Sequence, residues 1–158
     1  MANWCYNTVW FTGEPDVINS LTCFLYELAQ EGRRTGHGQL PDFITRKEGW
    51  MFELGWSGEF HFYTTKWKPN TNVLIEVADR YGLNFRHAYE ETGNRIFGVS
   101  AYEDGVLRTT DLDTEDFEAY CYNENTETYE FENAHYESSD EILQILLERK
   151  SAIQILTT

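Results

Sequence analysis

The chain has 158 residues and a formal net charge of −15, and this length suits one domain that can bury enough surface to fold without disulfides or metals. The acidity disfavours direct binding to duplex DNA or to an anionic membrane, because affinity for either comes from cationic side chains. No stretch approaches the roughly 18 apolar residues of a membrane span, and the start lacks the features of a signal peptide. We therefore expect a soluble, cytoplasmic protein.

The N-terminal third predicts a strand, a helix and a long basic loop. Residues 4–12 alternate in type as a strand does, and Gly13 interrupts the pattern. Pro15 suits the first turn of a helix whose apolar residues recur at three- and four-residue steps, and Gly32 is expected to end it. Residues 33–49 carry four Arg or Lys side chains and form the longest irregular stretch, which does not match a phosphate-binding loop.

The middle third predicts strands around a second helix. Two runs rich in aromatic residues, 50–56 and 59–67, predict a hairpin or one long strand with a bulge. Gly82 is expected to end the helix that follows, at the C′ position. Asp104-Gly105 is a strong hairpin turn. The predicted elements are the strand runs 50–56 and 59–67, the helix 73–81, and the strands 83–91, 95–102 and 106–110.

The last third changes in composition, because residues 103–158 carry 15 acidic and 3 basic side chains whereas residues 1–102 carry 12 and 9. Acidic and aromatic residues alternate here, and a Ser-Ser-Asp-Glu sequence is a good helix cap. The predicted elements are an acidic turn or helix start at 111–116, strands at 117–122 and 129–131, a short helix at 142–147 and a final strand at 152–156.

The order of these elements predicts an α+β fold, with two helices on one face of an antiparallel sheet in a ferredoxin-like arrangement. We expect a core over residues 1–110. Residues 111–158 are then an acidic extension of strands and a helix, packed on the same domain.

Two motifs resemble a known family. The opening MANWCYNTVWFTG supplies Asn3, Trp4, Cys5, Asn7, Val9 and Gly13, and Thr-x-Trp-x-Pro follows at residues 65–69, with Tyr89-Glu90-Glu91, Phe97-Gly98 and Asp104-Gly105 beyond it. Over residues 1–110 the chain resembles the YubB ferredoxin-like family, small proteins of phages, plasmids and other mobile elements. The resemblance implies a ferredoxin-like fold without an iron–sulfur cluster and a setting inside a host cell. It supplies no catalytic residue set.

The cysteines and histidines predict neither a metal site nor a catalytic site. Cys5, Cys23 and Cys121 have no pair spacing and are expected to be small buried hydrophobic residues. His61 and His87 lie on predicted strands and could approach each other across the sheet, near glutamates, but nothing supplies a nucleophile motif or zinc-site spacing. We expect no enzyme activity, no cofactor and no metal, although a cryptic enzyme using one of these histidines stays an alternative.

The aromatic side chains at residues 4–10 and 50–67 allow another function. They could form a base-stacking platform or a pocket for a nucleotide or small ligand, as sheets of this topology do in RNA-binding proteins. Few cations surround them, so an ordinary core explains many of these rings equally well.

The acidic last third carries the preferred functional hypothesis. Its carboxylates and tyrosines predict a surface that binds a host protein with a basic face, in the manner of a nucleic-acid mimic that inhibits a host defence system; a solvated acidic surface is the simpler alternative. The candidate partner-binding residues are Asp111, Asp113, Glu115, Asp116, Glu118, Tyr120, Tyr122, Glu124, Glu127, Glu130 and Glu132.

Overall fold

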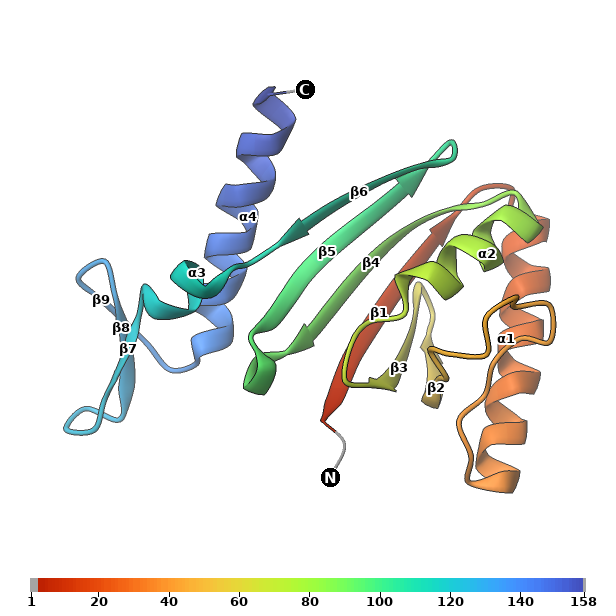
Figure 1. Cartoon of the computed structure of the whole chain (residues 1–158), viewed down its shortest axis with the longest axis horizontal. Helices are drawn as coiled ribbons and strands as arrows, with labels where there is room; N and C mark the ends of the chain where they lie inside the picture. The colour runs from red at the N-terminus through yellow and green to blue at the C-terminus, as the bar shows by residue number, and fades with distance from the viewer. Residues whose placement is uncertain (1–2, 158) are drawn as a thin grey trace. The chain divides into compact units, whose positions relative to one another are not determined.

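The structure is a computed structural model that describes the backbone of residues 3–157 and the side chains of residues 3–154. Met1 and Ala2 of the opening motif therefore lie outside the described residues. The elements, labelled in Figure 1, are β1 (Trp4–Thr12), α1 (Pro15–Thr35), β2 (Phe52–Ser57), β3 (Phe60–Lys66), α2 (Thr71–Tyr81), β4 (Asn84–Glu91), the 3₁₀ turn η1 (Thr92–Asn94), β5 (Ile96–Glu103), β6 (Val106–Asp111), α3 (Thr114–Glu118), β7 (Cys121–Asn123), β8 (Thr128–Phe131), β9 (Ala134–Tyr136) and α4 (Ser139–Thr157).

The main sheet has six strands in the order β2-β3-β1-β4-β5-β6. β1 is central and runs antiparallel to β3 on one side and β4 on the other, and Val9 lies opposite His61 in one pair and His87 in the other. The first six elements follow the β-α-β-β-α-β order of a split β-α-β fold. The predicted mixture of helices with an antiparallel sheet is therefore confirmed.

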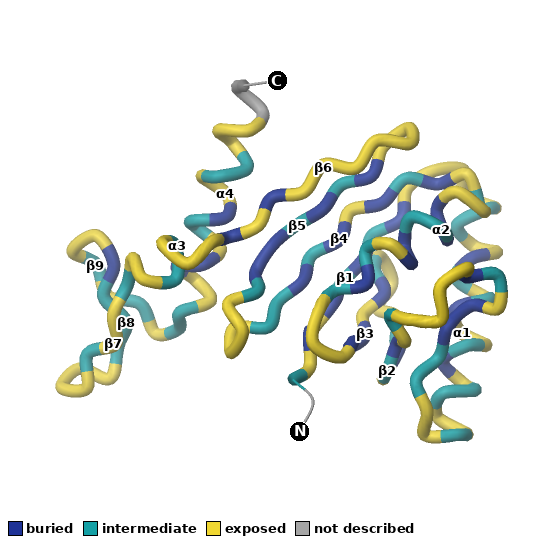
Figure 2. Tube along the Cα trace, viewed as in Figure 1, coloured by how far each residue is buried: buried dark blue, intermediate teal, exposed yellow. Residues whose placement is uncertain are grey.

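The hydrophobic core lies between this sheet and its two long neighbouring helices. In β1 every second residue is buried, from Cys5 to Phe11. α1 and α2 both pack on that face (Figure 1), and they contribute Leu21, Leu25, Leu74 and Val77 to one core cluster with Val9. In Figure 2 the strands beneath these helices alternate between buried and exposed segments. The opposite face of β1 and β3 carries the partly exposed residues of the alternation.

The chain divides into two compact units. Unit 1 comprises Met1–Glu91 and Val99–Thr109, and unit 2 comprises Thr92–Gly98 and Thr110–Thr158. β5 and β6 therefore contribute one part of their length to each unit. The expected division at residue 110 and the packing of the extension on the core both stay predictions.

Unit 2 contains α3, the three-stranded sheet β7-β8-β9 and α4. Its small core contains Leu112, Phe131, Ile142, Leu143 and Leu147. The described residues form four α-helices, so α3 and α4 of unit 2 add to the two helices expected on one face of the sheet.

The predicted end of α1 is wrong by three residues. The helix continues through Gly32 to Thr35, and Gly36 ends it in the left-handed conformation with its N–H bonded to the Gly32 carbonyl at 2.8 Å. Arg34 bonds to Glu31 one turn earlier, and the Thr35 hydroxyl donates to the Glu31 carbonyl at 2.9 Å. These local bonds favour another helical turn over an early stop at glycine.

Two predicted strands in the last third are also wrong. Residues 117–122 begin inside α3, because the Asp113 side chain caps the backbone N–H of Asp116 at 3.2 Å and only Cys121–Asn123 forms a strand. Residues 152–156 are helical, since α4 continues to Thr157. Arg149 and Lys150 lie within α4, and their side chains donate to the carboxylates of Glu132 and Asp116.

The prediction of three buried cysteines holds for Cys5 alone, since Cys23 and Cys121 are exposed.

The hairpin predicted within residues 50–67 is confirmed as β2 and β3, with a register irregularity between Phe52 and Gly55.

Candidate functional site

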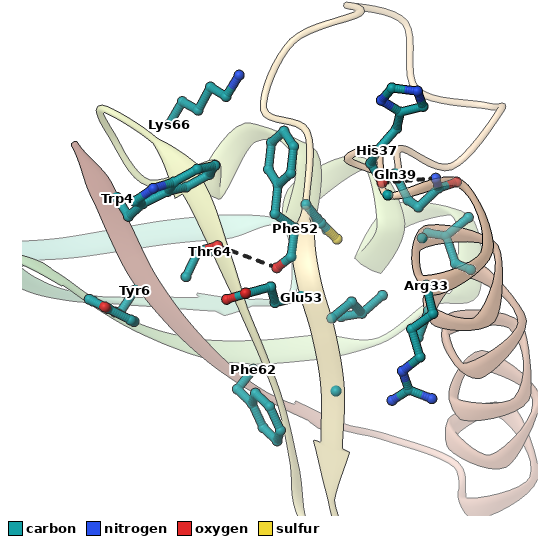
Figure 3. Close-up of a pocket in the computed structure, with 17 residues that line it drawn as sticks. Trp4, Tyr6, Arg33, His37, Gln39, Phe52, Glu53, Phe62, Thr64 and Lys66 are labelled. Atoms are coloured by element: carbon teal, nitrogen blue, oxygen red, sulfur yellow. Dashed lines mark hydrogen bonds between the residues drawn. The ribbon is translucent and has the colours of Figure 1, made fainter. Parts of the chain in front are cut away.

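Unit 1 contains a groove of about 970 Å³. It lies where the last turns of α1, the segment after it, the edge strand β2 and the outward faces of β3 and β1 meet (Figure 3). We call it the edge groove. Its side chains with aromatic, charged or polar character are Trp4, Tyr6, Arg33, His37, Gln39, Phe52, Glu53, Phe62, Thr64 and Lys66.

A bulge in β2 shapes this groove. Phe52 pairs with Thr64 and Gly55 pairs with Phe62, so two residues between them have no partner in the ladder. One of these, Glu53, has a φ of 53°, a left-handed conformation that costs free energy for a residue with a Cβ. The bulge redirects the edge of the sheet and places the Glu53 side chain at the groove.

Glycines allow aromatic rings to lie directly on the backbone here. A Cβ at Gly55 would come within 2.4 Å of the Phe62 ring, and a Cβ at Gly38 within 2.6 Å of the Phe52 ring. A two-way backbone bridge between Gln39 and Met51, at 2.7 and 2.8 Å, fixes the segment after α1 against the sheet edge. The residues Gly36 to Gln39, which the sequence presents as loop, are thus one wall of the groove.

The groove has a wall of aromatic rings with a cation above it. The Trp4 and Phe52 rings meet edge to face with centroids 5.0 Å apart, and the Lys66 ammonium lies 5.9 Å and 5.2 Å from their centroids. Tyr6 and Phe62 are 60% and 43% exposed. Exposed rings in such numbers on one face are uncommon in a monomer and mark binding surfaces.

The charges of the groove are not compensated within the chain. Among the residues whose side chains are described, neither Lys66 nor Arg33 has a carboxylate within 4.0 Å, whereas Arg34 pairs with Glu31 and Arg46 with Glu48. Lys66 and Arg33 both line the groove. The groove therefore presents two cations, Arg33 and Lys66, and one acid, Glu53, that form no ion pair with the described side chains.

A buried hydrogen-bond network joins the strands beneath the Trp4 end of the groove. The Asn7 amide donates to the Cys5 carbonyl and to the Thr65 hydroxyl, both at 2.9 Å, and Thr65 donates to the Lys68 carbonyl at 2.7 Å. The remaining Asn7 oxygen accepts from His87 Nε2 at 2.9 Å, which assigns the proton to Nε2.

His87 is therefore a neutral, structural histidine. Its Nδ1 accepts from the Thr71 hydroxyl at 3.2 Å, which connects β4 to the start of α2. Burial lowers the pKa of His87 to about 3, because a charged ring would lose its hydration there. The network uses both ring nitrogens and leaves neither for a ligand.

His61 shares the buried face with His87 but does not meet it. The two histidines lie on either side of Val9, and burial lowers the pKa of His61 to about 4. The cavity beside His61 measures about 10 Å³, which is too small for a substrate. Over the described part of the chain, no three His, Cys, Asp or Glu side chains are placed to hold a metal ion.

The acidic residues predicted to bind a partner all lie in unit 2, and several hold that unit together. Asp113 and Asp116 both accept from Lys150 at 2.8 Å, which joins α3 to α4. Glu118 accepts from Arg95 at 3.2 Å, and Glu132 forms a two-point pair with Arg149 at 2.7 and 2.9 Å.

Other predicted residues shape the small sheet. Glu130 accepts from Asn123 at 2.6 Å. The Tyr129 ring packs against Tyr120 and Tyr122 with centroids 6.0 and 5.0 Å apart. These residues contribute to folding, so only part of the predicted surface is available to a partner.

Four of the predicted residues remain as an accessible set. Glu115, Glu124 and Glu127 are exposed, and among the described side chains they form no hydrogen bond or ion pair. Tyr122 is 52% exposed. Asp111 is also exposed but has interactions of its own. Binding of a partner by these predicted residues stays a prediction.

The two aromatic stretches predicted from the sequence, at residues 4–10 and 50–67, contain the aromatic side chains of the groove. The sequence did not indicate Arg33 and Glu53 as groove residues. The alternation of Trp4 with Tyr6, and of Phe62 with Thr64 and Lys66, could have indicated a shared outward face. The bulge that exposes Glu53 has no comparable signal.

Comparison with known proteins identifies the family. Residues 49–132, just over half of the chain, match the family described as the ferredoxin-like domain in Api92-like protein. The chain therefore belongs to this family. The match begins at the loop before β2 and extends past residue 110 into β8, so it includes part of the acidic region. No curated protein and no solved structure matches the chain. None of the described helices is long and apolar enough to span a membrane.

Proposed function

We propose that this member of the family of ferredoxin-like domains in Api92-like proteins binds a nucleotide in the edge groove. The observation that carries the proposal is the combination, in one groove of about 970 Å³, of aromatic walls with two cations that no carboxylate neutralises.

The size and chemistry of the groove support a nucleotide. Ligand pockets commonly measure roughly 300–1,000 Å³. Exposed Trp4, Tyr6 and Phe62 rings offer stacking surfaces for a base. Lys66, which lies over the Trp4 and Phe52 rings, is suited to a phosphate, since an unpaired cation gains more from an anion than one already in an ion pair. A single nucleotide also fits the net charge of −15 better than a nucleic-acid strand, which needs many cations.

The proposed activity is binding without catalysis. His61 and His87 are the histidines of the alternative in which the protein is an enzyme, and each is at most 5% exposed. Lysine, arginine and aromatic rings in the groove suit recognition of a ligand, and they supply neither a nucleophile with an adjacent base nor a metal site.

Fluorescence titration with the four nucleoside 5′-monophosphates tests this proposal. All five tryptophans lie in unit 1, and stacking on Trp4 should quench the emission. Trp4→Ala should weaken binding about tenfold or more, the usual effect of removing one stacking ring. Trp56→Ala is the matched control, because Trp56 is 54% exposed but does not line the groove.

Lys66→Ala should weaken a nucleotide more than the corresponding nucleoside, because only the nucleotide carries the phosphate. No binding of any nucleotide at millimolar concentration, or equal losses in Trp4→Ala and Trp56→Ala, would contradict the proposal.

A second candidate function concerns unit 2, which we propose binds a host protein with a basic surface. Unit 2 contains 13 acidic and 3 basic residues. Arg95, Arg149 and Lys150 each pair with carboxylates inside the unit. The remaining acidic charge therefore faces solvent or a partner, and charge of one sign steers association with a basic surface.

Charge reversal tests this second candidate without disturbing the fold. Glu115→Lys, Glu124→Lys and Glu127→Lys together should abolish capture of partners from a host lysate at low salt. Reversal of Asp113 or Asp116 is unsuitable, because those residues hold α3 and α4. Captured proteins that persist unchanged in 0.5 M salt, where charges are strongly screened, would contradict this candidate.

The biological setting is also a proposal. We propose that the chain is a YubB-like protein of a phage or plasmid, located in the host cytoplasm. There the acidic surface of unit 2 acts as a nucleic-acid mimic against a defence complex. The motifs at residues 3–13 and 65–69 support the family name, and the charge distribution supports the mimicry.

A further inference from the structure

We infer that Glu53 makes the edge groove selective for guanine among the nucleotide bases. This inference rests on the proposed nucleotide binding and adds the identity of the base. Glu53 is the acidic side chain among the described residues that line the groove.

Glu53 adopts a left-handed backbone conformation at the bulge of β2, as one of seven described residues other than glycine with a positive φ. Its φ of 53° lies in the left-handed region, where a glutamate is held at a cost that structures tolerate mainly at functional positions. Its carboxylate is exposed, and it forms no hydrogen bond or ion pair with the other described side chains. Glu53 therefore does not act as a cap or as an ion-pair partner.

The bulge directs this carboxylate toward the aromatic side of the groove. Figure 3 shows the Glu53 side chain leaving β2 on the side away from α1, toward the face of the sheet that carries Trp4, Tyr6 and Phe62. The neighbouring residue Phe52 belongs to the stacking wall. A base stacked on these rings would present its edge to the carboxylate.

A carboxylate is an acceptor with two oxygens, so it favours a base edge with two adjacent donors. Guanine has such an edge in its N1–H and its exocyclic amino group. Adenine offers one amino donor beside an acceptor nitrogen that the carboxylate repels, and the same holds for cytosine. Uracil has a single N–H between two carbonyl groups. Guanine is therefore the base whose edge Glu53 complements.

Titration of the full chain with GMP, IMP, AMP, CMP and UMP tests the inference. GMP should bind about tenfold or more tightly than AMP, a discrimination typical of a two-point side-chain contact to a base edge. IMP, which lacks the exocyclic amino group, should fall between GMP and AMP. A guanine-rich oligonucleotide that binds more tightly than GMP per base would show that the nucleotide is part of a strand, and would overturn selectivity for the free nucleotide.

Glu53→Gly removes the carboxylate while keeping the backbone conformation, because glycine adopts a positive φ readily. This variant should fold normally and bind GMP and AMP with equal affinity. Glu59→Gln is the matched control, because Glu59 is an exposed acid in the turn between β2 and β3 that does not line the groove. It should keep the preference for GMP.

The result separates the two proposals. Equal affinity for GMP and AMP, sensitive to Trp4→Ala, would retain nucleotide binding and overturn the role of Glu53. An unchanged GMP preference in Glu53→Gly would also overturn it. No nucleotide binding at all would overturn the proposed function and this inference with it.

Discussion

The two units of this protein use polar residues in different ways. In unit 1 a buried network of neutral side chains, Asn7, Thr65 and His87, connects neighbouring strands. In unit 2 ionised side chains near the surface connect the elements, as in the contacts of Lys150 with Asp113 and Asp116. The groove cations of unit 1 have no such partners.

This difference shows why charge content alone is a poor guide to the functional surface. Unit 2 has the higher density of charge, but its three cations and several of its acids stabilise the unit itself. Unit 1 has a lower density of charge, but the charges at its groove are available to a ligand. The availability of a charged group depends on its neighbours, which a residue count does not report.

Replacing Asn7 gives the largest expected effect and tests whether unit 1 depends on its neutral network. Asn7→Ala leaves the His87 N–H without its acceptor, removes the donor to the Thr65 hydroxyl and opens a cavity, so it should cost about 3–5 kcal/mol in the free energy of unfolding. Urea unfolding followed by tryptophan fluorescence measures this cost, since every tryptophan is in unit 1. Thr8→Ala, on the opposite face of β1, is the control; an equal loss there would contradict the role of the network.

Acid should weaken unit 1 through its buried histidines. Burial lowers the pKa of His61 to about 4 and of His87 to about 3 from an ordinary value of 6.5. Between these values the unfolded chain binds more protons than the folded one, so stability is complete above pH 6.5 and falls as the pH decreases.

From pH 7 to pH 5 the loss should be up to about 2 kcal/mol for each histidine. Unfolding curves at the two pH values measure it, and most carboxylates stay ionised over this interval. His61→Phe should remove about half of the dependence and fold normally, because His61 makes an edge-to-face contact with Phe11 that a phenyl ring can keep. A dependence that survives this change in full would contradict the assignment.

The smallest effect is expected in unit 2, where Lys150→Met removes the cation between α3 and α4. The Lys150 ammonium, as the main hydrogen-bond donor, lowers the pKa of Asp113, so the variant should raise that pKa toward its ordinary value. The backbone amide of Asp116 should exchange about fivefold faster, since its cap is weakened.

NMR titration of Asp113 and amide exchange measure the two changes. In the wild type this stabilisation is present above the ordinary pKa of an aspartate and is lost as the pH falls through the lowered one. The tryptophan-monitored stability of unit 1 should not change. A change in the stability of unit 1, with no change in the pKa of Asp113 or in the exchange of Asp116, would contradict the proposed difference between the units.

The sequence predicted the elements whose signals are local. β1, α2 and the hairpin of β2 and β3 follow from alternation, helical spacing and turn residues, and the Asp104-Gly105 turn leads into β6 as expected. Local signals misled where two of them conflicted, at Gly32 within α1 and at the basic pair Arg149 and Lys150 within α4.

By itself, then, the sequence determined an α+β fold with an antiparallel sheet, because side-chain periodicity fixes which face of each element is buried. Only the tertiary structure decided what is available for binding. It paired the cations of unit 2 with its acids, buried both strand histidines, and joined Trp4, Phe52 and Lys66 from three strands around one groove. Contacts between residues far apart in the chain depend on strand register and on a bulge, and neither is encoded in a local pattern.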